Sequence, residues 1–469
     1  MNKDNYKENE SQVESELDKL NISDNDSSSV NINHKNCYKP EDNKLWCKEC
    51  VPRCIIEGWT SGNNDIDEFI KDTIYNTKYS DDDDYYYPFF LEWVPFDRFK
   101  DVKQIGEGGF AKVYSATWID GKAEYKRQND ESWKKEEPKP IKVALKKLND
   151  SQNISANYLN EIKTLWIIYF NDSNNYLNFY GITKDTKTGE FMMIIQLADQ
   201  GNLRSILSSN FNNIFWNKKL QILHNIVHDL KNLHELGYFH KDFHSGNLLQ
   251  NRDDNNDNLT YVSDFGLSGQ LNEQRSDDKI CGVLPYIAPE VLNGEPYTFS
   301  SDVYSFGIIM TELSFGKTPF YNRKHDISLV LEICNGIRPE FGKGTPEIYK
   351  KLAYRCMSAI PNQRPTADEL YDILVIWWNA SNGNYQNEEK FGDKVKEIKA
   401  IFDEANKEIP NISTSYEKIP DAIYTSRVFT FSNLPKPVNS SIITSYLEDE
   451  EDNKDCQDSK LFDLEVPSN

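Results

Sequence analysis

The sequence predicts an α+β fold of two lobes between residues 97 and 380, with a β-rich half followed by an α-rich half. Strand-like runs come first, at residues 102–105, 111–117, 142–148 and 191–196. After residue 201 apolar residues recur at helical spacing, most clearly at 220–233, and this stripe stops at Gly237. Strands followed by helices, rather than alternating with them, are typical of the α+β class.

The segments on either side of this region have a different composition. Residues 1–33 are rich in Asn, Ser, Asp and Glu and are predicted to be disordered. Residues 34–80 hold a cysteine cluster and then a predicted amphipathic helix at 59–76, capped by Asn63 or Asn64. Residues 119–141 form a polar insertion, and residues 381–469 are predicted to be a mostly disordered acidic tail with one helix at 391–407.

The composition excludes several classes of protein. The chain has 469 residues, a formal net charge of -22 and a pI near 4.8, which argues against nucleic acid or anionic membrane as general partners. No apolar run reaches the roughly 18 to 20 residues that span a bilayer, and the first residues lack an apolar signal core. Eight cysteines do not suggest a disulfide scaffold. We therefore expect a cytoplasmic or nuclear protein.

Three glycines stand between two of the predicted strands, in residues 106–111. Glycines such as Gly106 and Gly108 allow a backbone to approach phosphate groups and to offer amide donors. A hairpin with a glycine-containing turn explains this stretch equally well when it is taken alone. A dinucleotide-binding fold would require a helix directly afterwards, whereas residues 112–114 resemble a strand.

Lys146 lies within an apolar strand-like run and needs an anionic partner if it is half-buried. ATP phosphates would supply one such partner. Glu161, on the predicted helix that follows, would supply another and fix the ammonium group in place. A surface lysine is the simpler alternative, and the neighbouring Lys147 fits that description.

Two further stretches with polar residues suited to phosphate transfer follow the predicted helix, first residues 240–247 and then residues 264–266. Asp242 would orient an attacking hydroxyl and accept its proton. Asn247 and Asp264 would hold Mg²⁺ against a nucleotide triphosphate. A polar turn after a helix would explain either stretch alone, but not the ordered set.

A buried ion pair is predicted between Glu290, in the Ala288-Pro289-Glu290 stretch, and Arg364. A bidentate pair of this kind would anchor the segment before it to the helical lobe. Asp302, at the start of an apolar helix, is expected to hold the backbone of residues 240–242.

These motifs, over about 280 of the 469 residues, resemble the protein kinase superfamily. The wording of residues 244–249 and 282–290 resembles the tyrosine-kinase-like group and a fungal branch of it. The resemblance implies a bilobal protein kinase that transfers the γ-phosphate of ATP to protein substrates in signalling, with Asp242, Lys146, Glu161, Asn247 and Asp264 as catalytic residues and Mg²⁺ at Asn247 and Asp264. It also implies a nucleotide site lined by Ile105, Gly106, Gly108, Phe110, Val113, Ala144, Lys146, Leu197 and Leu249.

The sequence departs from the family pattern at positions that bear on regulation and substrate class. Lys241 stands where an arginine usually reads a phosphate, so activation is expected not to depend strongly on loop phosphorylation, with Asp277 and Asp278 already beside Ser276. His244 replaces a lysine typical of serine/threonine kinases. The balance favours serine/threonine specificity, with a tyrosine or dual-specificity kinase, or a pseudokinase that acts as a scaffold, as the alternatives.

The cysteine cluster predicts a small zinc site in the N-terminal segment. His34, Cys37, Cys47 and Cys50 have the paired spacing of a zinc ribbon or knuckle, and Cys54 is a rival ligand. Free thiols in an unstructured segment explain the same residues equally well. Both this segment and the tail are candidates for binding protein partners.

Overall fold

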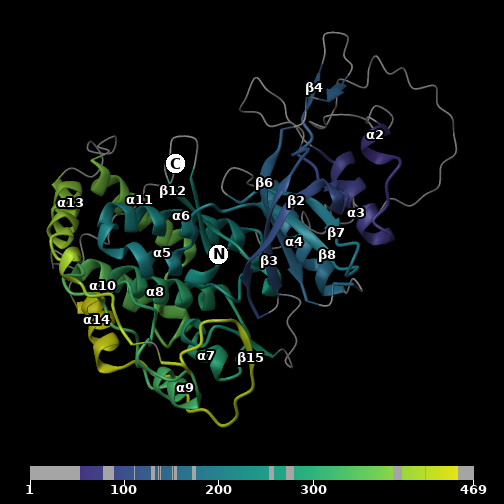
Figure 1. Ribbon diagram of the computed structural model, residues 1–469. Helices are drawn as coiled ribbons and strands as arrows, with labels where there is room; N and C mark the ends of the chain where they lie inside the picture. Colours follow the sequence, from purple (N-terminus) through teal and green to yellow (C-terminus); the bar gives the residue numbers. More distant parts are fainter. Residues whose placement is uncertain are drawn as a thin grey trace, which may run out of the picture. The chain divides into compact units, whose positions relative to one another are not determined.

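The computed structural model describes residues 53–77, 89–109, 111–127, 133–135, 137, 139–149, 151–152, 156–171, 176–252, 258–270, 279–383, 393–417 and 419–452 (Figure 1). The chain divides into two compact units, one from residues 1–102, 116–142 and 180–194, and the other from residues 103–115, 143–179 and 195–469. Several strands begin in one unit and end in the other, so the units do not correspond to two continuous stretches of sequence.

A six-stranded sheet forms the β-rich N-terminal half, with the strand order β1-β7-β8-β6-β3-β2. Its strands are β1 (Glu92–Trp93), β2 (Phe99–Glu107), β3 (Ala111–Trp118), β6 (Ile141–Leu148), β7 (Phe179–Lys184) and β8 (Phe191–Gln196). The four strand-like runs of the sequence fall in β2, β3, β6 and β8, so these predictions are confirmed. The predicted insertion between β3 and β6 carries an antiparallel pair, β4 (Tyr125–Arg127) and β5 (Trp133–Lys135).

The predicted N-terminal helix is present as α3 (Asn64–Tyr75), preceded by the short α2 (Arg53–Ile56). The Asn63 side chain accepts a hydrogen bond from the Ile66 amide at 3.1 Å, which confirms it as the cap. The helix begins later than the predicted residue 59 because Asp67 accepts hydrogen bonds from Ser61 and draws the preceding residues into a turn. Its apolar side chains Ile66, Phe69, Ile70 and Ile74 are buried.

Helices make up most of the C-terminal half, as expected. They are α5 (Leu203–Asn210), α6 (Trp216–Glu235), α7 (Pro289–Leu292), α8 (Phe299–Phe315), α9 (Ile327–Cys334), α10 (Glu347–Cys356), α11 (Ala367–Asn382), α13 (Asp393–Asn406) and α14 (Ser441–Asp452). One further helix, α4 (Ala156–Asn171), lies earlier in the chain, between β6 and β7. Among the described residues, no helix combines the length and the apolar character that a membrane crossing requires.

Two helices, α6 and α8, carry the core of the helical half. The apolar stripe of α6 is buried from Leu220 to Leu233, and α11 packs along this helix. Nearly every side chain of α8 is buried, because the helix is apolar on all sides. Thr298 and Ser301 form a capping box at its start, and Gly316 ends it in the left-handed conformation.

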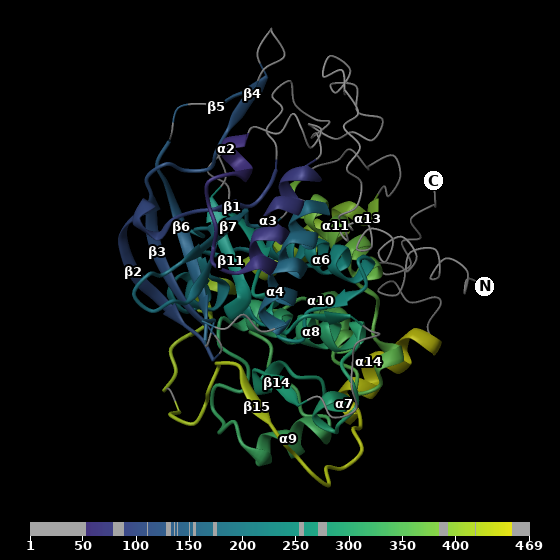
Figure 2. The ribbon, with the colours of Figure 1, turned by 90° about the vertical axis from the view of Figure 1, so that its right-hand side faces the viewer.

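Short strands connect the helices and carry the loops of the candidate site. They are β9 (Gly201–Asn202), β10 (Tyr238–Phe239), β11 (Leu248–Arg252), β12 (Asn258–Val262), β13 (Gly269–Gln270), β14 (Ile280–Gly282) and β15 (Arg427–Phe429). β11 lies between β12 and β9, β10 pairs with β13, and β14 pairs with β15. The β14–β15 pair is a separate two-stranded sheet, next to α9 (Figure 2).

Residues 393–417 and 419–452 differ from the expectation of a mostly disordered tail, because they are ordered along the helical half. The predicted helix at 391–407 is present as α13 (Asp393–Asn406), which packs on α11. Further on, β15 adds to β14, and α14 contacts α10 (Figure 2). Isolated apolar side chains hold this segment: Ile409, Ile412 and Ile443 are buried. Single anchors without a repeat leave no periodic pattern in the sequence, which is why the segment appeared disordered.

Candidate active site

The candidate active site begins with Lys146 on β6 (Ile141–Leu148), which points into a largely buried cluster of opposite charges. Lys146 Nζ lies 2.8 Å from Glu161 Oε1, on α4, and 2.7 Å from Asp264 Oδ1. The Lys146 and Glu161 side chains are only 10% and 7% exposed, whereas that of Asp264 is 43% exposed. The structure thus brings together three of the five predicted catalytic residues through one ammonium group.

The charges in this cluster depend on one another. Burial by itself would lower the pKa of Lys146, but the negative charges of Asp264 and Glu161 raise it above its ordinary value. Burial raises the pKa of Glu161 despite the nearby ammonium, whereas Lys146 holds the pKa of the more exposed Asp264 below its ordinary value. Lys146 therefore stays positive, and Asp264 is the carboxylate that keeps its negative charge most firmly.

The loop of residues 240–247 presents Asp242 next to this cluster. Asp302, on α8, accepts hydrogen bonds from the backbone amides of His240 at 2.7 Å and Lys241 at 3.1 Å, which confirms its predicted role. Lys241 has a φ of 65°, and the His240 ring lies 3.0 Å from the Ser263 carbonyl oxygen. A buried carboxylate thus holds a strained turn in place.

Asp242 itself is buried and sits among several polar groups. The Asn247 amide nitrogen donates to the Asp242 carbonyl oxygen at 3.0 Å, and His244 Nε2 lies 3.5 Å from Asp242 Oδ1. Burial opposes ionisation of Asp242, but the His244 and His240 rings and the Ser426 hydroxyl lower its pKa to about 2. Such a weak base is suited to orienting a hydroxyl and to accepting its proton late in a transfer.

His244 faces Asp242 with a defined ring nitrogen. Its Nδ1 accepts a hydrogen bond from the Gly246 amide at 3.0 Å, and Arg204 Nη2 lies 3.3 Å from the same atom. Because two donors converge on Nδ1, the proton of the neutral ring belongs on Nε2, the atom that faces Asp242. A Cβ at Gly246 would collide with the His244 ring, so glycine is required there.

The turn at residues 264–266 positions Asp264 and supports its neighbours. Asp264 has a φ of 66°, in the left-handed region, and Phe265 is buried with its ring 5.3 Å from that of His240. A Cβ at Gly266 would lie 2.9 Å from Glu161 Oε2, so this glycine lets the turn approach α4 closely. Glycine is therefore needed where the chain passes the Lys146–Glu161 pair.

Asn247 and Asp264 have the donor groups that Mg²⁺ prefers, an amide oxygen and a carboxylate. The Asn247 nitrogen is engaged with the Asp242 carbonyl oxygen, which leaves the amide oxygen as the coordinating atom. The described residues contain no cluster of three or more His, Cys, Asp and Glu side chains suited to a metal. The two oxygen donors of Asn247 and Asp264 fit an ion that takes its remaining ligands from water and phosphates.

The predicted nucleotide-binding residues fall on strands and loops around this cluster. The β2–β3 turn is closed by a 2.8 Å hydrogen bond from the Gly108 amide to the Ala111 carbonyl oxygen, and Gly106 lies at the end of β2. Apolar side chains that remain partly or fully exposed complete the set: Ile105, Val113, Ala144, Leu197 and Leu249. Phe110 lies outside the described residues.

The predicted pair of Glu290 and Arg364 is confirmed. Arg364 Nη1 and Nη2 each lie 2.7 Å from one Glu290 carboxylate oxygen, and both side chains are nearly inaccessible to water. Arg364 Nε also donates to the Ser358 carbonyl oxygen at 2.8 Å. This bidentate contact fastens α7 to the loop before α11.

Sequence reasoning missed a buried polar network beneath the loop of residues 240–247, which we call the catalytic loop. Glu312, on α8, accepts hydrogen bonds from Ser245 Oγ at 2.9 Å and from the Tyr286 hydroxyl at 2.6 Å. Burial raises the pKa of Glu312, although the charge of Arg204 opposes this shift. The available signal was a second carboxylate in the same mostly apolar helix as Asp302, because a buried carboxylate needs a partner.

It also missed Ser426, whose hydroxyl donates a hydrogen bond to Asp242 Oδ2. No local motif marked this residue, because it lies in the segment that was expected to be disordered.

Several predicted residues lie outside the described residues. They are the zinc candidates His34, Cys37, Cys47 and Cys50 and the loop residues Ser276, Asp277 and Asp278. Lys241, which stands where the family has an arginine, has its Nζ 5.2 Å from the centroid of the Phe239 ring.

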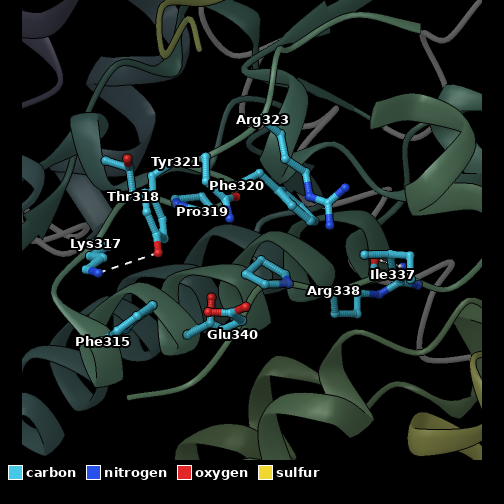
Figure 3. A pocket seen from close by; sticks show the side chains of 13 residues that line it. Phe315, Lys317, Thr318, Pro319, Phe320, Tyr321, Arg323, Ile337, Arg338 and Glu340 are labelled. Carbon is cyan, nitrogen blue, oxygen red and sulfur yellow. Dashed lines mark hydrogen bonds between the residues drawn. The ribbon is translucent and has the colours of Figure 1, made fainter. Parts of the chain in front are cut away.

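A pocket of about 60 Å³ lies after α8, lined by residues that include Phe315, Lys317, Tyr321 and Glu340 (Figure 3). Lys317 Nζ lies 3.5 Å from the Tyr321 hydroxyl across one side of it. None of the predicted site residues lines this pocket. It is far smaller than the roughly 300 to 1,000 Å³ of small-molecule sites, so it does not compete with the Lys146–Asp242 region.

Known proteins with similar sequences are named as serine/threonine-protein kinases. A probable LIM domain-containing serine/threonine-protein kinase of Dictyostelium discoideum is 30% identical over 211 residues, which cover 45% of this chain and 21% of that protein. A putative serine/threonine-protein kinase/receptor of Acanthamoeba polyphaga mimivirus is 28% identical over 290 residues, covering 60% of this chain and 16% of the relative. Another probable serine/threonine-protein kinase of Dictyostelium discoideum is 28% identical over 285 residues, 60% of this chain and 16% of that protein.

The chain thus matches about a fifth or less of the length of these relatives. The family model described as protein tyrosine and serine/threonine kinase matches residues 99–374, which include all five predicted catalytic residues. Because this match covers more than half of the sequence, the chain belongs to the family of protein tyrosine and serine/threonine kinases.

Proposed function

We propose that this protein is an ATP-dependent protein kinase that transfers the γ-phosphate of ATP to serine or threonine hydroxyls of proteins, in intracellular signalling. One observation carries the proposal. Lys146 bridges Glu161 and Asp264, while Asp242 and Asn247 are joined in the adjacent loop. A phosphotransfer site needs this set, a positive group for phosphates, metal ligands, and a carboxylate for the hydroxyl.

Each residue has a distinct task in this proposal. Lys146, kept charged by its two carboxylates, binds the nucleotide phosphates. Asn247 and Asp264 hold Mg²⁺, which neutralises charge that develops on the phosphates. Asp242 orients the acceptor hydroxyl and receives its proton. The apolar side chains around Ala144 and Leu249 contact the adenine base.

The preference for serine and threonine is supported by the relatives, which are named as serine/threonine-protein kinases. A tyrosine or dual-specificity kinase, and a pseudokinase or scaffold that binds ATP without efficient transfer, are the alternatives. The intact set of five catalytic residues favours transfer over the scaffold.

The direct test is transfer of labelled phosphate from ATP to generic protein substrates, followed by phosphoamino acid analysis. We expect phosphoserine and phosphothreonine. Asp242→Asn should lower the rate by about two orders of magnitude or more while ATP still binds, because the phosphate contacts remain. Asp372→Asn, on an exposed position of α11, is the matched control and should keep the wild-type rate. A wild-type rate no higher than that of Asp264→Ala would refute the proposal.

We also propose that the chain belongs to the tyrosine-kinase-like group and its fungal branch, on the wording of residues 244–249 and 282–290. A cytoplasmic or nuclear location is supported by Cys334 and Cys356, which are buried and form no disulfide within the described residues. Imaging of the tagged full chain would test this location.

The net charge of -22 supports protein substrates, rather than nucleic acid or membrane, as partners.

Zinc binding by His34, Cys37, Cys47 and Cys50 is a separate proposal that rests on their spacing in the sequence. Protein purified without chelator should hold about one zinc per chain, and a His34→Ala, Cys37→Ser double variant should lose it. Elemental analysis that finds no zinc in the wild-type protein would exclude the site. The segment and the tail would then still be candidates for binding protein partners.

A further inference from the structure

The C-terminal segment passes through the candidate active site as an added strand. β15 (Arg427–Phe429) pairs antiparallel with β14 (Ile280–Gly282), with Arg427 opposite Gly282 and Phe429 opposite Ile280. β14 belongs to the stretch between Asp264 and the Ala288-Pro289-Glu290 turn. Addition of a strand to an exposed edge is a common way in which proteins hold extended peptides. The backbone of residues 427–429 is therefore bound as a peptide would be bound.

The register of this pairing brings Ser426 to the catalytic carboxylate. Gly282 has a φ of 135°, and a Cβ at this position would lie 3.5 Å from Asp242 Oδ1, so the end of β14 lies against Asp242. Ser426 directly precedes β15, and its hydroxyl donates a hydrogen bond to Asp242 Oδ2. On its other side, a Cβ at Gly109 would collide with the Ser426 carbonyl oxygen. Ser426 thus lies between the catalytic loop and the glycine-containing turn.

Contacts upstream of Ser426 fix its position. The Tyr424 hydroxyl donates to the Pro319 carbonyl oxygen at 2.9 Å, and its own carbonyl oxygen accepts from Arg204 Nη1 at 2.8 Å. The His325 amide donates to the Asp421 carbonyl oxygen at 3.0 Å. These contacts leave little freedom in the residues that lead to Ser426.

Contacts on both flanks tether the segment to the helical half. Before it, Asn212 Nδ2 donates to the Ile409 carbonyl oxygen at 3.0 Å. After it, the Val438 amide donates to the Cys334 carbonyl oxygen at 2.9 Å, and the Ala359 amide donates to Asn439 Oδ1 at 2.6 Å. A segment tethered at both ends has an effective local concentration on the order of millimolar or more.

Neighbouring hydroxyls do not share this position. The Tyr424 hydroxyl is engaged with Pro319, away from Asp242, and Thr425 is exposed to solvent. Among the described side chains, Ser426 is the hydroxyl that hydrogen-bonds to the Asp242 carboxylate. This is the contact that an acceptor hydroxyl makes with the catalytic aspartate during phosphotransfer.

We propose that Ser426 is the acceptor of an intramolecular phosphoryl transfer, with residues 424–429 in the place of a protein substrate; the inference rests on the proposed kinase activity. Ser426 Oγ forms a bond to the γ-phosphorus of ATP as the bond from that phosphorus to the β–γ bridging oxygen breaks. ADP leaves with that electron pair, and the hydroxyl proton passes to Asp242 and then to water.

After the transfer, phosphorylated Ser426 no longer fits beside Asp242, where a substrate hydroxyl binds. A phosphoserine carries about −1.5 to −2 charges at neutral pH. Repulsion between this group and the Asp242 carboxylate weakens the docked strand, so phosphorylation of Ser426 opens the site to other proteins. The segment thus acts once as a substrate and afterwards no longer covers the catalytic loop.

The test uses the purified full chain with Mg²⁺ and ATP, and follows Ser426 by mass spectrometry of its peptide. We expect phosphate on Ser426 with a first-order rate constant that changes less than about twofold over a roughly 100-fold dilution, because the acceptor is tethered. When wild type is mixed with tagged Asp242→Asn chains, Ser426 of the tagged chains should stay unmodified. Transfer to an added generic substrate should accelerate as Ser426 becomes phosphorylated.

Two variants check the assignment of the acceptor. Ser426→Thr keeps the hydroxyl and should move the label on this peptide from phosphoserine to phosphothreonine. Thr425→Ala changes the adjacent hydroxyl and should leave the labelling of Ser426 intact.

The outcomes separate the two proposals. Wild-type protein that phosphorylates an added substrate while Ser426 stays unmodified would overturn the inference and leave the kinase activity standing. A rate of Ser426 phosphorylation proportional to protein concentration would also overturn it, because the transfer would then occur between molecules. A constant rate toward the added substrate would overturn the opening step. Absence of transfer both to Ser426 and to the added substrate would refute the proposed function itself.

Discussion

Lys146 and Lys219 are both buried lysines, but carboxylates surround the ammonium group of the first and aromatic rings that of the second. Lys146 lies between the carboxylates of Glu161 and Asp264. Lys219, on α6, is fully buried, and its Nζ lies 4.1 Å from the centroid of the Phe211 ring and 4.9 Å from that of Trp216. Its ammonium group has no hydrogen-bond partner among the residues that the structure describes.

The two lysines respond to burial in opposite ways. The carboxylates raise the pKa of Lys146 against the effect of burial, whereas burial alone lowers the pKa of Lys219 to about 7. Aromatic rings attract a cation but do not replace a carboxylate. A buried ammonium thus remains charged where chemistry requires it only because the fold supplies two anions, and Lys219 shows what the same burial does without them.

The largest expected effect is the loss of phosphotransfer when the charge of Lys146 is removed. Lys146→Met should lower the rate of phosphotransfer by about three orders of magnitude, about 4 kcal/mol of barrier, because the phosphates lose their positive partner. The assay is the initial rate with labelled ATP and a generic substrate. Lys147→Met, at the next and more accessible position of the same strand, is the matched control. A rate for Lys146→Met within tenfold of the control would show that this paired lysine does not serve the phosphates.

Arg364 extends the comparison to a third buried cation, one that is fully paired. Arg364→Met should lower the free energy of unfolding by about 3 to 5 kcal/mol, because Glu290 would remain buried without its partner. Urea unfolding of the two proteins measures the difference. Arg355→Met removes a half-exposed contact with Glu369 and should cost about 1 kcal/mol or less. Equal losses from the two variants would contradict the role assigned to burial.

Glu161→Gln tests whether Lys146 needs both of its carboxylates. The rate should fall by roughly 10-fold to 100-fold, about 1.4 to 2.7 kcal/mol, because the ammonium is no longer held toward the phosphates. Glu404→Gln, on an exposed position of α13, serves as the control. Since burial raises the pKa of Glu161, an unchanged rate would indicate that Glu161 is protonated and that Asp264 alone balances the lysine.

The smallest expected effect is the change in stability caused by a substitution at Lys219, and this change depends on pH. Lys219 binds fewer protons in the folded state than in the unfolded state between its folded pKa of about 7 and an unfolded value of about 10.4. Its contribution therefore makes stability rise with pH through this window. Lys219→Met should stabilise the protein by about 1 kcal/mol at pH 7, net of the lost contacts with the rings.

The measurement is urea unfolding of wild type and Lys219→Met at pH 7 and pH 9. The stabilising effect of the substitution should be smaller at pH 9, where the folded wild-type lysine is already neutral. Lys343→Met, at a side chain that is 78% exposed, is the control and should show no such trend. A larger benefit of Lys219→Met at pH 9 than at pH 7 would contradict the depressed pKa.

Much of the site could be predicted because its residues lie in short stretches with a fixed order. Asp242 and Asn247 share one loop, Asp264 begins the next turn, and Lys146 stands within an apolar strand. The helical stripe of α6 and the pair of Glu290 and Arg364 were likewise visible, since spacing and charge carry that information.

The sequence by itself thus determined the order of strands and helices in the kinase region and the chemical groups of the catalytic set. Only the tertiary structure decided that Ser426 meets Asp242, across 184 residues of sequence, that Lys219 is buried beside two rings, and that the C-terminal segment is ordered. The physical reason is the same in each case. A local pattern records how a residue relates to its neighbours in the chain, whereas contacts such as that of Tyr424 with Pro319 arise from single anchors that fit a surface built by distant elements.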